Sequence, residues 1–183
     1  MKLGVISDTH GSLKGWEKGW EILKNSDVII HCGDLFNHGP GNPVPEGYNP
    51  KELCNIFNNL SIPLLIVKGN CDSEVDQLFL KLPFSYPYLF VQFSELRILA
   101  SHGHIFSDEE WEQIGEKWKI NILISGHTHK WKLEKKSNIV ILNPGSPSLP
   151  KCDEFTVAQI DTEERKVKVF NLDTKKVLVE ESF

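Results

Sequence analysis

The chain has 183 residues, of which 40% are hydrophobic and 25% are charged, and this ordinary globular usage excludes disordered, collagen-like and coiled-coil proteins. Its 20 basic and 25 acidic side chains leave a net charge of −5, which argues against a nucleic-acid partner, because such partners usually face a basic surface. No apolar run approaches the ~20 residues of a membrane span, and the opening MKLGVISD has one lysine and a short apolar run that stops at an acid, unlike a signal peptide.

The first half of the chain alternates strands with helices. Apolar runs predict strands over residues 3–7, 28–32 and 63–67, and helical spacing predicts helices over 13–23, 51–60 and 74–82. Ser12 is placed to cap the first helix, and the stripe containing Trp16 and Trp20 is typical of core packing. Residues 35–50 are rich in Gly, Pro and Asn, which predicts a long irregular segment of the kind that usually carries function.

The second half is dominated by strands. A hairpin is predicted from strands 88–93 and 96–101, followed by a helix over 108–119 and a strand over 122–125. Further strands are predicted over 131–134, 139–142, 155–160 and 167–172. Lysines alternate with valines in the last of these, which indicates a sheet with one face in water. No repeat or low-complexity tract interrupts residues 1–183, so we expect a single domain.

Cysteine usage is that of a cytoplasmic protein. The four cysteines are widely spaced and form no C-x-x-C pair, which argues against a zinc knuckle or a thioredoxin-like motif. We therefore expect them to remain reduced.

Polar residues stand just past the ends of five predicted strands. They are Asp8 and His10, Asp34, Asn70, His102 and His104, and His127 and His129. Strands of an α/β sheet that end in polar residues form one crevice at their carboxyl ends. Residues two apart in extended chain point the same way, so each D-x-H or H-x-H pair is expected to face one small object. The neighbouring glycines allow close approach and sharp turns.

The side chains of this set are typical of a metal centre. Carboxylates, an amide oxygen and imidazoles suit Mn²⁺, Fe²⁺, Ni²⁺ or catalytic Zn²⁺. Seven side chains are too many for one tetrahedral ion and suit two ions. Two divalent ions carry a charge of +4 and the two carboxylates carry −2. The remaining charge of +2 is enough to bind a hydroxide and a phosphate group. Such a centre promotes in-line displacement at phosphorus. Taken singly, Asp34 is equally explained as a turn cap and Asn70 as a turn residue. Five such strand ends together favour the metal centre.

The ordered motifs resemble the signature of the metallophosphoesterase (calcineurin-like) superfamily. They are Asp8-Thr9-His10, Gly33-Asp34, Gly69-Asn70-Cys71-Asp72, His102-Gly103-His104 and Gly126-His127-Thr128-His129. The stretches at 37–40 and 45–48 are similar to those of the bacterial YfcE-type phosphodiesterases. The resemblance implies a four-layer α/β/β/α sandwich and a dinuclear centre, often supported by Mn²⁺, with Mg²⁺ as another candidate.

The resemblance also implies roles for these residues. Asp8, His10 and His129 are expected to hold the first ion, and Asn70, His102 and His127 the second. Asp34 is expected to bridge both ions, and a metal-bound hydroxide to attack phosphorus. The catalytic set is thus Asp34, Asn70, Cys71 and His104.

Cys71 departs from the superfamily pattern, because many members carry a histidine there that can protonate the leaving group. A thiol has a reference pKa near ~8.5, and two nearby cations would favour the thiolate, which cannot donate a proton. Protonation then falls to His104 or His38, or is unnecessary for acidic leaving groups. A packing role for Cys71 is the alternative.

Several further residues are placed near the centre. Asn37, His38 and His104 are candidate substrate contacts, although the 35–50 segment also suits a homo-oligomer contact. Asp72 is expected to orient a ligand such as a histidine. His31, inside a strand, is expected to be a satisfied buried histidine, and Ser146 is either a substrate contact or part of a plain turn.

The sequence therefore predicts a cytoplasmic, metal-dependent phosphodiesterase that acts on small phosphodiesters and has no membrane partner. A phosphomonoesterase of the same fold is the nearest alternative. A non-catalytic scaffold like the retromer subunit of this fold is another alternative. Loss of a metal-binding residue would favour it, but here a suitable side chain stands at every expected metal-ligand position. A nuclease acting on DNA ends would need a basic groove, which the composition does not indicate.

Overall fold

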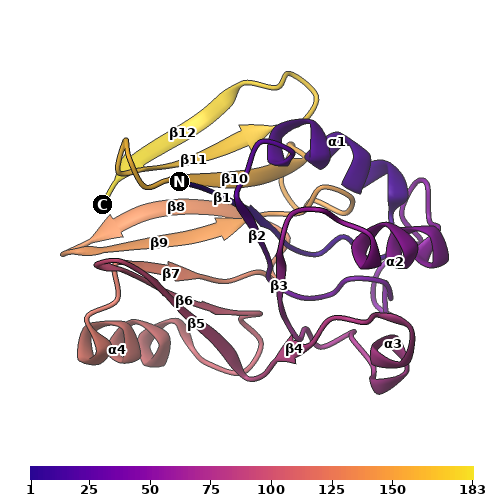
Figure 1. Cartoon of the computed structure of the whole chain (residues 1–183), viewed down its shortest axis with the longest axis horizontal. Helices are drawn as coiled ribbons and strands as arrows, with labels where there is room; N and C mark the ends of the chain where they lie inside the picture. Colours follow the sequence, from indigo (N-terminus) through magenta and orange to yellow (C-terminus); the bar gives the residue numbers. More distant parts are fainter.

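The computed structural model describes residues 1–183, in which two β-sheets face each other and helices cover their outer faces (Figure 1). The first sheet has seven strands, in the order β12 (Val177–Ser182), β11 (Lys166–Asn171), β10 (Thr156–Asp161), β1 (Lys2–Ile6), β2 (Val28–His31), β3 (Leu64–Val67) and β4 (Phe84–Ser85). The second has five, in the order β5 (Tyr88–Phe93), β6 (Leu96–Ser101), β7 (Ile122–Ile124), β9 (Ile139–Pro144) and β8 (Trp131–Lys136). The helices are α1 (Leu13–Leu23), α2 (Pro50–Asn58), α3 (Glu74–Phe79) and α4 (Asp108–Trp118).

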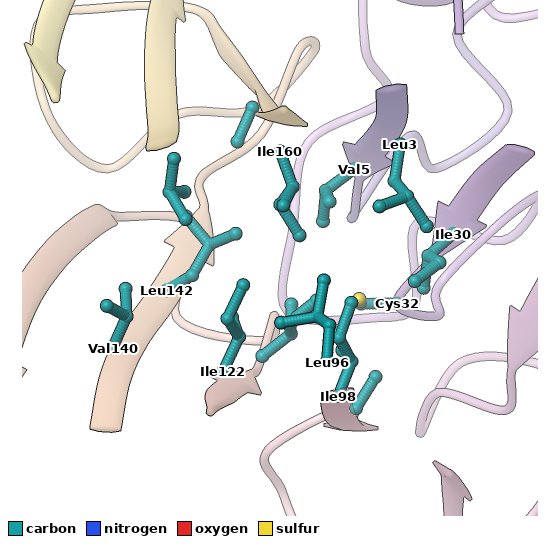
Figure 2. Close-up of a cluster of buried hydrophobic side chains, with 14 of the residues drawn as sticks. Leu3, Val5, Ile30, Cys32, Leu96, Ile98, Ile122, Val140, Leu142 and Ile160 are labelled. Carbon is teal, nitrogen blue, oxygen red and sulfur yellow. The ribbon is translucent and has the colours of Figure 1, made fainter. Parts of the chain in front are cut away.

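Three apolar clusters hold these layers together. The largest lies between the two sheets and is formed by inward-facing side chains such as Val5, Ile30, Ile98 and Leu142 (Figure 2). A second packs α1 and α2 onto the seven-stranded sheet, and a third packs α4 onto the five-stranded sheet. This is the predicted four-layer α/β/β/α sandwich, which is confirmed; the single-domain organisation stays a prediction.

The local sequence explains the helix starts. The Ser12 side chain accepts from the backbone N–H of Gly15, which confirms the predicted cap of α1. The Trp16 side chain is buried in the core, as predicted. At α4, Ser107 and Glu110 form a capping box. None of the four helices has both the length and the apolar character needed to cross a bilayer.

Two strands were not predicted. β4 has only two residues, too few to give a periodic pattern. β12 is an edge strand whose side chains are largely exposed, so it lacks the apolar alternation that marks a half-buried strand. In β11, by contrast, Val167 and Val169 are buried, and the alternating Lys166 and Lys168 reach Glu180 and Glu164, as the alternation predicted.

Candidate metal centre

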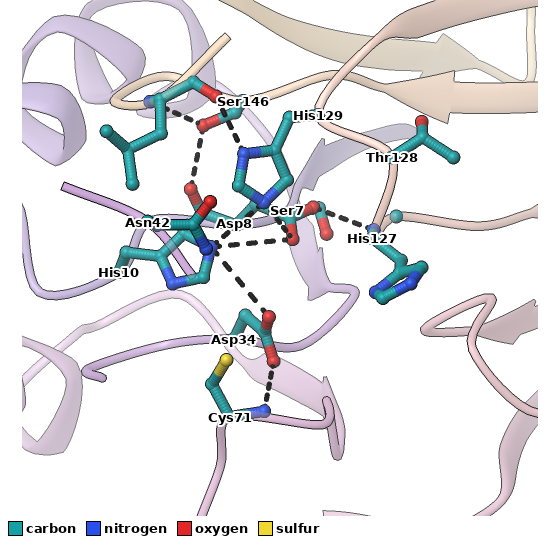
Figure 3. Close-up of polar contacts among 12 residues, drawn as sticks. Ser7, Asp8, His10, Asp34, Asn42, Cys71, His127, Thr128, His129 and Ser146 are labelled. Atoms are coloured by element: carbon teal, nitrogen blue, oxygen red, sulfur yellow. Dashed lines mark hydrogen bonds and ion pairs between the residues drawn. The ribbon is translucent and has the colours of Figure 1, made fainter. Parts of the chain in front are cut away.

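The five polar strand ends meet at one edge of the sandwich. β1, β2 and β3 run parallel in the first sheet, and β6 and β7 run parallel in the second, so their carboxyl ends open onto shared loops. Three groups of potential ligand atoms lie there, and within each group the atoms are all within 4.8 Å of one another. They are Asp8, His10 and His129; Asp8, Asp34 and His102; and His10, Asp34 and Cys71. Segments 119 residues apart in sequence are thereby brought into contact (Figure 3).

The backbone at these positions is not extended, so the expectation of extended D-x-H and H-x-H pairs is wrong. Asp8 and His10 have φ of 56° and 47°, and His127 and His129 have φ of 68° and 59°. Non-glycine residues rarely adopt this left-handed region, and where they do the strain is usually tied to function. Backbone bonds hold it in place, since the N–H of His10 donates to Asp34 O at 2.9 Å.

Two glycines permit the close approach of these loops. A Cβ at Gly69 would lie 2.2 Å from Asp34 Oδ1, and a Cβ at Gly126 would lie 2.0 Å from Ser7 Oγ and 2.9 Å from Asp8 Oδ2. Any side chain at either position would therefore displace a carboxylate or Ser7, whose hydroxyl donates to Cys32 O.

Each carboxylate has one oxygen anchored by the backbone and one facing the centre. Asp8 Oδ2 accepts from the N–H of His127 at 3.0 Å, and Asp34 Oδ1 accepts from the N–H of Cys71 at 2.8 Å (Figure 3). Asp34 Oδ2 lies 3.8 Å from His10 Nε2 and 3.4 Å from His102 Nε2, between the two rings. Asp8 Oδ1 is buried without a hydrogen-bond partner.

The histidines present their free nitrogens to the same point. The Nδ1 atoms of His10, His102 and His129 lie 2.6, 2.6 and 2.7 Å from backbone carbonyls, and because a carbonyl only accepts, each Nδ1 must donate. Where such a ring is neutral, its Nε2 turns a lone pair inward, and the Nε2 atoms of His10 and His129 are 3.0 Å apart. Two lone pairs at this distance repel unless a cation or a proton lies between them.

The charges of the centre are mutually dependent. Burial opposes ionisation of Asp34, but its contact with His102 outweighs burial and holds the pKa of that carboxyl below its usual range. Burial likewise lowers the pKa of His102, yet the contacts with Asp34 and Asp8 prevail and raise it to about 9. Without a metal the centre thus carries a proton on His102, and an entering cation displaces it.

Three predicted residues lie at the exposed rim. Asn70 Oδ1 is 3.0 Å from His102 Nε2, so the amide oxygen borders the centre. The His127 ring lies 5.1 Å from that of His102, outside the groups of closest ligand atoms. The His104 ring is 5.3 Å from His102 and 6.0 Å from His127. The metal-binding roles of Asn70 and His127 stay predictions.

Cys71 was not expected to belong to the ligand set, but its Sγ lies in one group with His10 and Asp34. Burial and the Asp34 carboxylate raise the pKa of the Cys71 thiol to about 12. In the metal-free protein this side chain is therefore a thiol, and it is placed to contact either a cation or a substrate oxygen.

The two substrate candidates from the 35–50 segment are held by other groups. The Asn37 amide donates to Asp76, while its backbone carbonyl orients His10. The His38 ring packs edge-on against Tyr48, and its Nδ1 is buried without a partner. Their substrate contacts, and the oligomer contact of this segment, stay predictions.

Asp72 supports the loop of Asp34 and does not orient a histidine, so that part of the expectation is wrong. Its carboxylate accepts the backbone N–H groups of Asp34, Leu35 and Gly69 at 2.8, 2.7 and 2.8 Å. Nothing in the sequence marks these bonds, because the three donors are main-chain groups from two separate loops.

Ser146 and His31 also act on the backbone. Ser146 is fully buried and donates to Asp8 O at 2.8 Å, which excludes the substrate contact and assigns it to the turn beneath the centre. His31 is buried between Thr9 and Gly33, with both ring nitrogens in hydrogen bonds, as expected of a satisfied histidine. Burial lowers its pKa to about 3, so it is neutral.

The donor set fits divalent cations. An unpartnered buried carboxylate oxygen and two opposed imidazole lone pairs are costly without a cation. The mixture of oxygen and nitrogen ligands is the kind used by catalytic Mn²⁺, Fe²⁺, Ni²⁺ and Zn²⁺ sites.

Comparison with known proteins points to one family. A family model of the calcineurin-like phosphoesterase superfamily domain matches residues 1–165. The chain is 39% identical over 153 residues to phosphodiesterase YfcE of Escherichia coli K12, covering 82% of each protein. It is 27% identical over 176 residues to phosphodiesterase MJ0936 of Methanocaldococcus jannaschii, covering 92% of this chain and 97% of that protein.

Solved structures agree. The structure of YfcE, a phosphoesterase from E. coli, superposes with a TM-score of 0.88 at 32% identity, covering 100% of this chain and 99% of that one. Vps29 from Entamoeba histolytica superposes with a TM-score of 0.69 at 19% identity, covering 99% of this chain and 97% of that one, which shows a shared fold alone.

Proposed function

Because this chain belongs to the calcineurin-like phosphoesterase superfamily, it is a metallophosphoesterase, and we propose that it hydrolyses small phosphodiesters at a dinuclear metal centre. The observation that carries the proposal is the orphaned Asp8 Oδ1, buried 3.3 Å from His129 Nε2 and 3.8 Å from His10 Nε2. A positive charge at the middle of this arrangement would pair with the orphaned oxygen and with both imidazole nitrogens.

We assign the metal ligands as follows. Asp8, His10 and His129 hold one ion, Asn70, His102 and His127 hold the other, and Asp34 bridges them. The position of Asp34 Oδ2 between His10 and His102 supports the bridge. Asp8 Oδ1 also lies 4.0 Å from His102 Nε2, so its charge acts on both halves of the centre. Mn²⁺ is our first choice of ion, with Ni²⁺, Fe²⁺, Zn²⁺ and Mg²⁺ as alternatives.

When bound, the two ions neutralise charge on the phosphoryl group and activate water as the nucleophile. The chain's own residues orient this chemistry. The Nδ1–H groups of the three histidines donate to the backbone carbonyls of Asn37, Cys32 and Leu149, which fixes the direction of each Nε2. The backbone N–H groups of His127 and Cys71 fix the two carboxylates.

Among the residues not assigned to metal, His104 lies beside two proposed ligands, with its ring centroid 5.3 Å from that of His102 and 6.0 Å from that of His127. Burial and the charge of His102 lower its pKa, so at neutral pH it offers an N–H hydrogen bond and few protons. In the metal-free protein, burial and the Asp34 carboxylate raise the pKa of the Cys71 thiol to about 12, whereas bound cations would favour the thiolate, which cannot donate a proton. Because neither state of Cys71 supplies a proton readily, we propose that the protein prefers diesters with acidic leaving groups.

Hydrolysis of bis-p-nitrophenyl phosphate and of p-nitrophenyl phosphate by metal-stripped protein, with each ion added back, tests the proposal. We expect no activity after chelation, recovery with Mn²⁺, and faster cleavage of the diester. Preference for the monoester would favour a phosphomonoesterase, and activity that survives chelation would refute the metal mechanism. Inactivity with every ion would favour a protein-binding scaffold.

The reduced, unpaired state of all four cysteines supports a cytoplasmic location.

A further inference from the structure

β5 is the outermost strand of the five-stranded sheet, on the side away from β8 (Figure 1). It pairs with β6 in unbroken register, from Tyr88 opposite Ser101 to Phe93 opposite Leu96. Beyond this ladder, no hydrogen bond reaches the main chain of residues 88–93. In an antiparallel pair, every second residue of an edge strand turns its N–H and C=O away from its neighbour. β5 therefore presents a row of unpaired main-chain donors and acceptors.

The other three sheet edges carry protection that β5 lacks. β4 has only two residues, and β8, of sequence WKLEKK, is rich in lysine. β12 carries Glu180 and Glu181, its register shifts against β11, and Ser182 O accepts from Lys135 of β8. Short length, charge and irregular register are the usual devices that prevent pairing at an edge. β5, of sequence YLFVQF, has no charge, no proline and no register shift.

Exposed aromatic side chains lie beside this open edge. Tyr88 and Phe90, two residues apart on the outer face of β5, are 37% and 44% exposed. Trp118 at the end of α4 is 37% exposed, and its ring centroid lies 5.4 Å from that of Tyr88 and 6.5 Å from that of Phe90. The three rings border an open hollow of about 630 Å³. Adjoining exposed rings of this kind mark an interaction surface.

The charges of α4 favour a second copy of this chain as the partner. Its first turn holds three acidic residues, 108–110, whereas Lys117 and Lys119 lie at its other end. Within α4 only Glu112 forms an ion pair, with Lys136, so the charges at both ends stay free. A partner of a single charge would suit only one end of α4. A second copy in the opposite direction offers each end its complement.

Antiparallel pairing of two β5 strands produces this arrangement of the helices. Arg97 donates to Trp118 O at 3.2 Å, which places the basic end of α4 beside Arg97, the residue opposite Gln92 in the ladder. Tyr88 lies opposite Ser101, at the end of β6 from which the chain leads to the acidic start of α4. In an antiparallel pair, the Tyr88 end of one β5 meets the Gln92 end of the other. The acidic end of each α4 then faces the basic end of the other across the joint.

We propose that two copies of this chain associate through β5, antiparallel about a two-fold axis, so that their five-stranded sheets become one continuous sheet. The outward N–H and C=O groups of each β5 pair with those of the other. No like charges oppose each other in this pairing, because β5 is uncharged. Phe90 lies near the axis, and its exposed ring is covered by the second copy.

Sedimentation velocity of the full chain loaded with Mn²⁺, over a range of protein concentrations, measures the association. We expect a dimer, or a multiple of it, with a dissociation constant in the micromolar range or tighter. Phe90→Lys should weaken this contact at least about 30-fold, the effect of losing one aromatic anchor of an interface. Val177→Lys is the matched control, because Val177 is an apolar residue of the edge strand β12 with 43% exposure, and it should associate as the wild type does.

Amide hydrogen exchange of the wild type locates the contact without any variant. Exchange of residues 88–93 should slow as association proceeds, while that of residues 177–182 should not change. A chain that stays monomeric throughout the range would overturn the proposal. So would an assembly that Phe90→Lys leaves intact, equal weakening in Val177→Lys, or unchanged exchange of residues 88–93. Mass and exchange do not depend on catalysis, so each result leaves the proposed phosphodiesterase activity untouched.

Discussion

Replacing Asp72 with asparagine should weaken metal binding while changing the unfolding free energy of the protein little. The Asp72 carboxylate, 6% exposed, accepts three backbone N–H groups, and two of them share Oδ2. An amide oxygen in the place of Oδ2 keeps the bonds to Asp34 and Gly69. The amide NH₂ then faces the N–H of Leu35, and two donors cannot bond to each other.

The two energetic consequences of Asp72→Asn nearly cancel at pH 7. The mismatch with Leu35 costs about 1–3 kcal/mol. Against this, burial raises the pKa of Asp72 from 3.8 to about 6, and the ionised form therefore costs about 3 kcal/mol at pH 7. This cost grows as pH rises from about 4 to about 6 and is nearly constant above that, and the neutral amide avoids it. We expect the unfolding free energy of the metal-free protein to change by less than about 2 kcal/mol.

Metal affinity should nevertheless fall, because the displaced Leu35 backbone adjoins Asp34. We expect a loss of about 10–100-fold, the usual effect of removing a group that orients a ligand. Calorimetric titration with Mn²⁺ measures the affinity, and urea unfolding measures the stability. Asp161→Asn is the matched control, since Asp161 also accepts two backbone N–H groups but lies at the end of β10, away from the centre. Wild-type metal affinity in Asp72→Asn would refute the reasoning.

Four further predictions concern the centre itself. Asp34→Asn should lower diesterase turnover more than about 100-fold by removing the bridge, and unchanged turnover would exclude that role. Cys71→His should speed cleavage of diesters with poor leaving groups while Cys71→Ser does not; equal rates in all three proteins would remove this position from the mechanism. His102, with a pKa of about 9, must lose its proton before it can bind a metal ion. The apparent metal affinity, measured at a series of pH values, should therefore fall by up to tenfold for each pH unit below 9. An affinity that does not change with pH would contradict this. Gly126→Ala, whose Cβ would lie 2.0 Å from Ser7 Oγ, should weaken metal binding at least about tenfold, as the same titration would detect.

The strand ends made the centre predictable from the sequence. Apolar runs located β1, β2, β3, β6 and β7, and the polar residues that follow them could be placed together because parallel strands finish at one edge. The ligand chemistry then followed from residue types alone. This reasoning placed Asp8, Asp34 and His102 near one another although they are far apart in the chain.

Other features depend on backbone contacts that no sequence pattern encodes. The left-handed φ of Asp8 and His10 is imposed by hydrogen bonds to the neighbouring loop, which override the extended geometry assumed for D-x-H. Asp72 binds main-chain donors that any residue type would supply. The exposed strand β12 has neither a buried face nor a long apolar run.

Anomalous diffraction from crystals grown with Mn²⁺ tests the dinuclear centre most directly. We predict two peaks, one beside His10 and His129 and the other beside His102, with the Asp34 carboxylate touching both. A single peak, or peaks that leave Asp34 unliganded, would contradict the proposed centre.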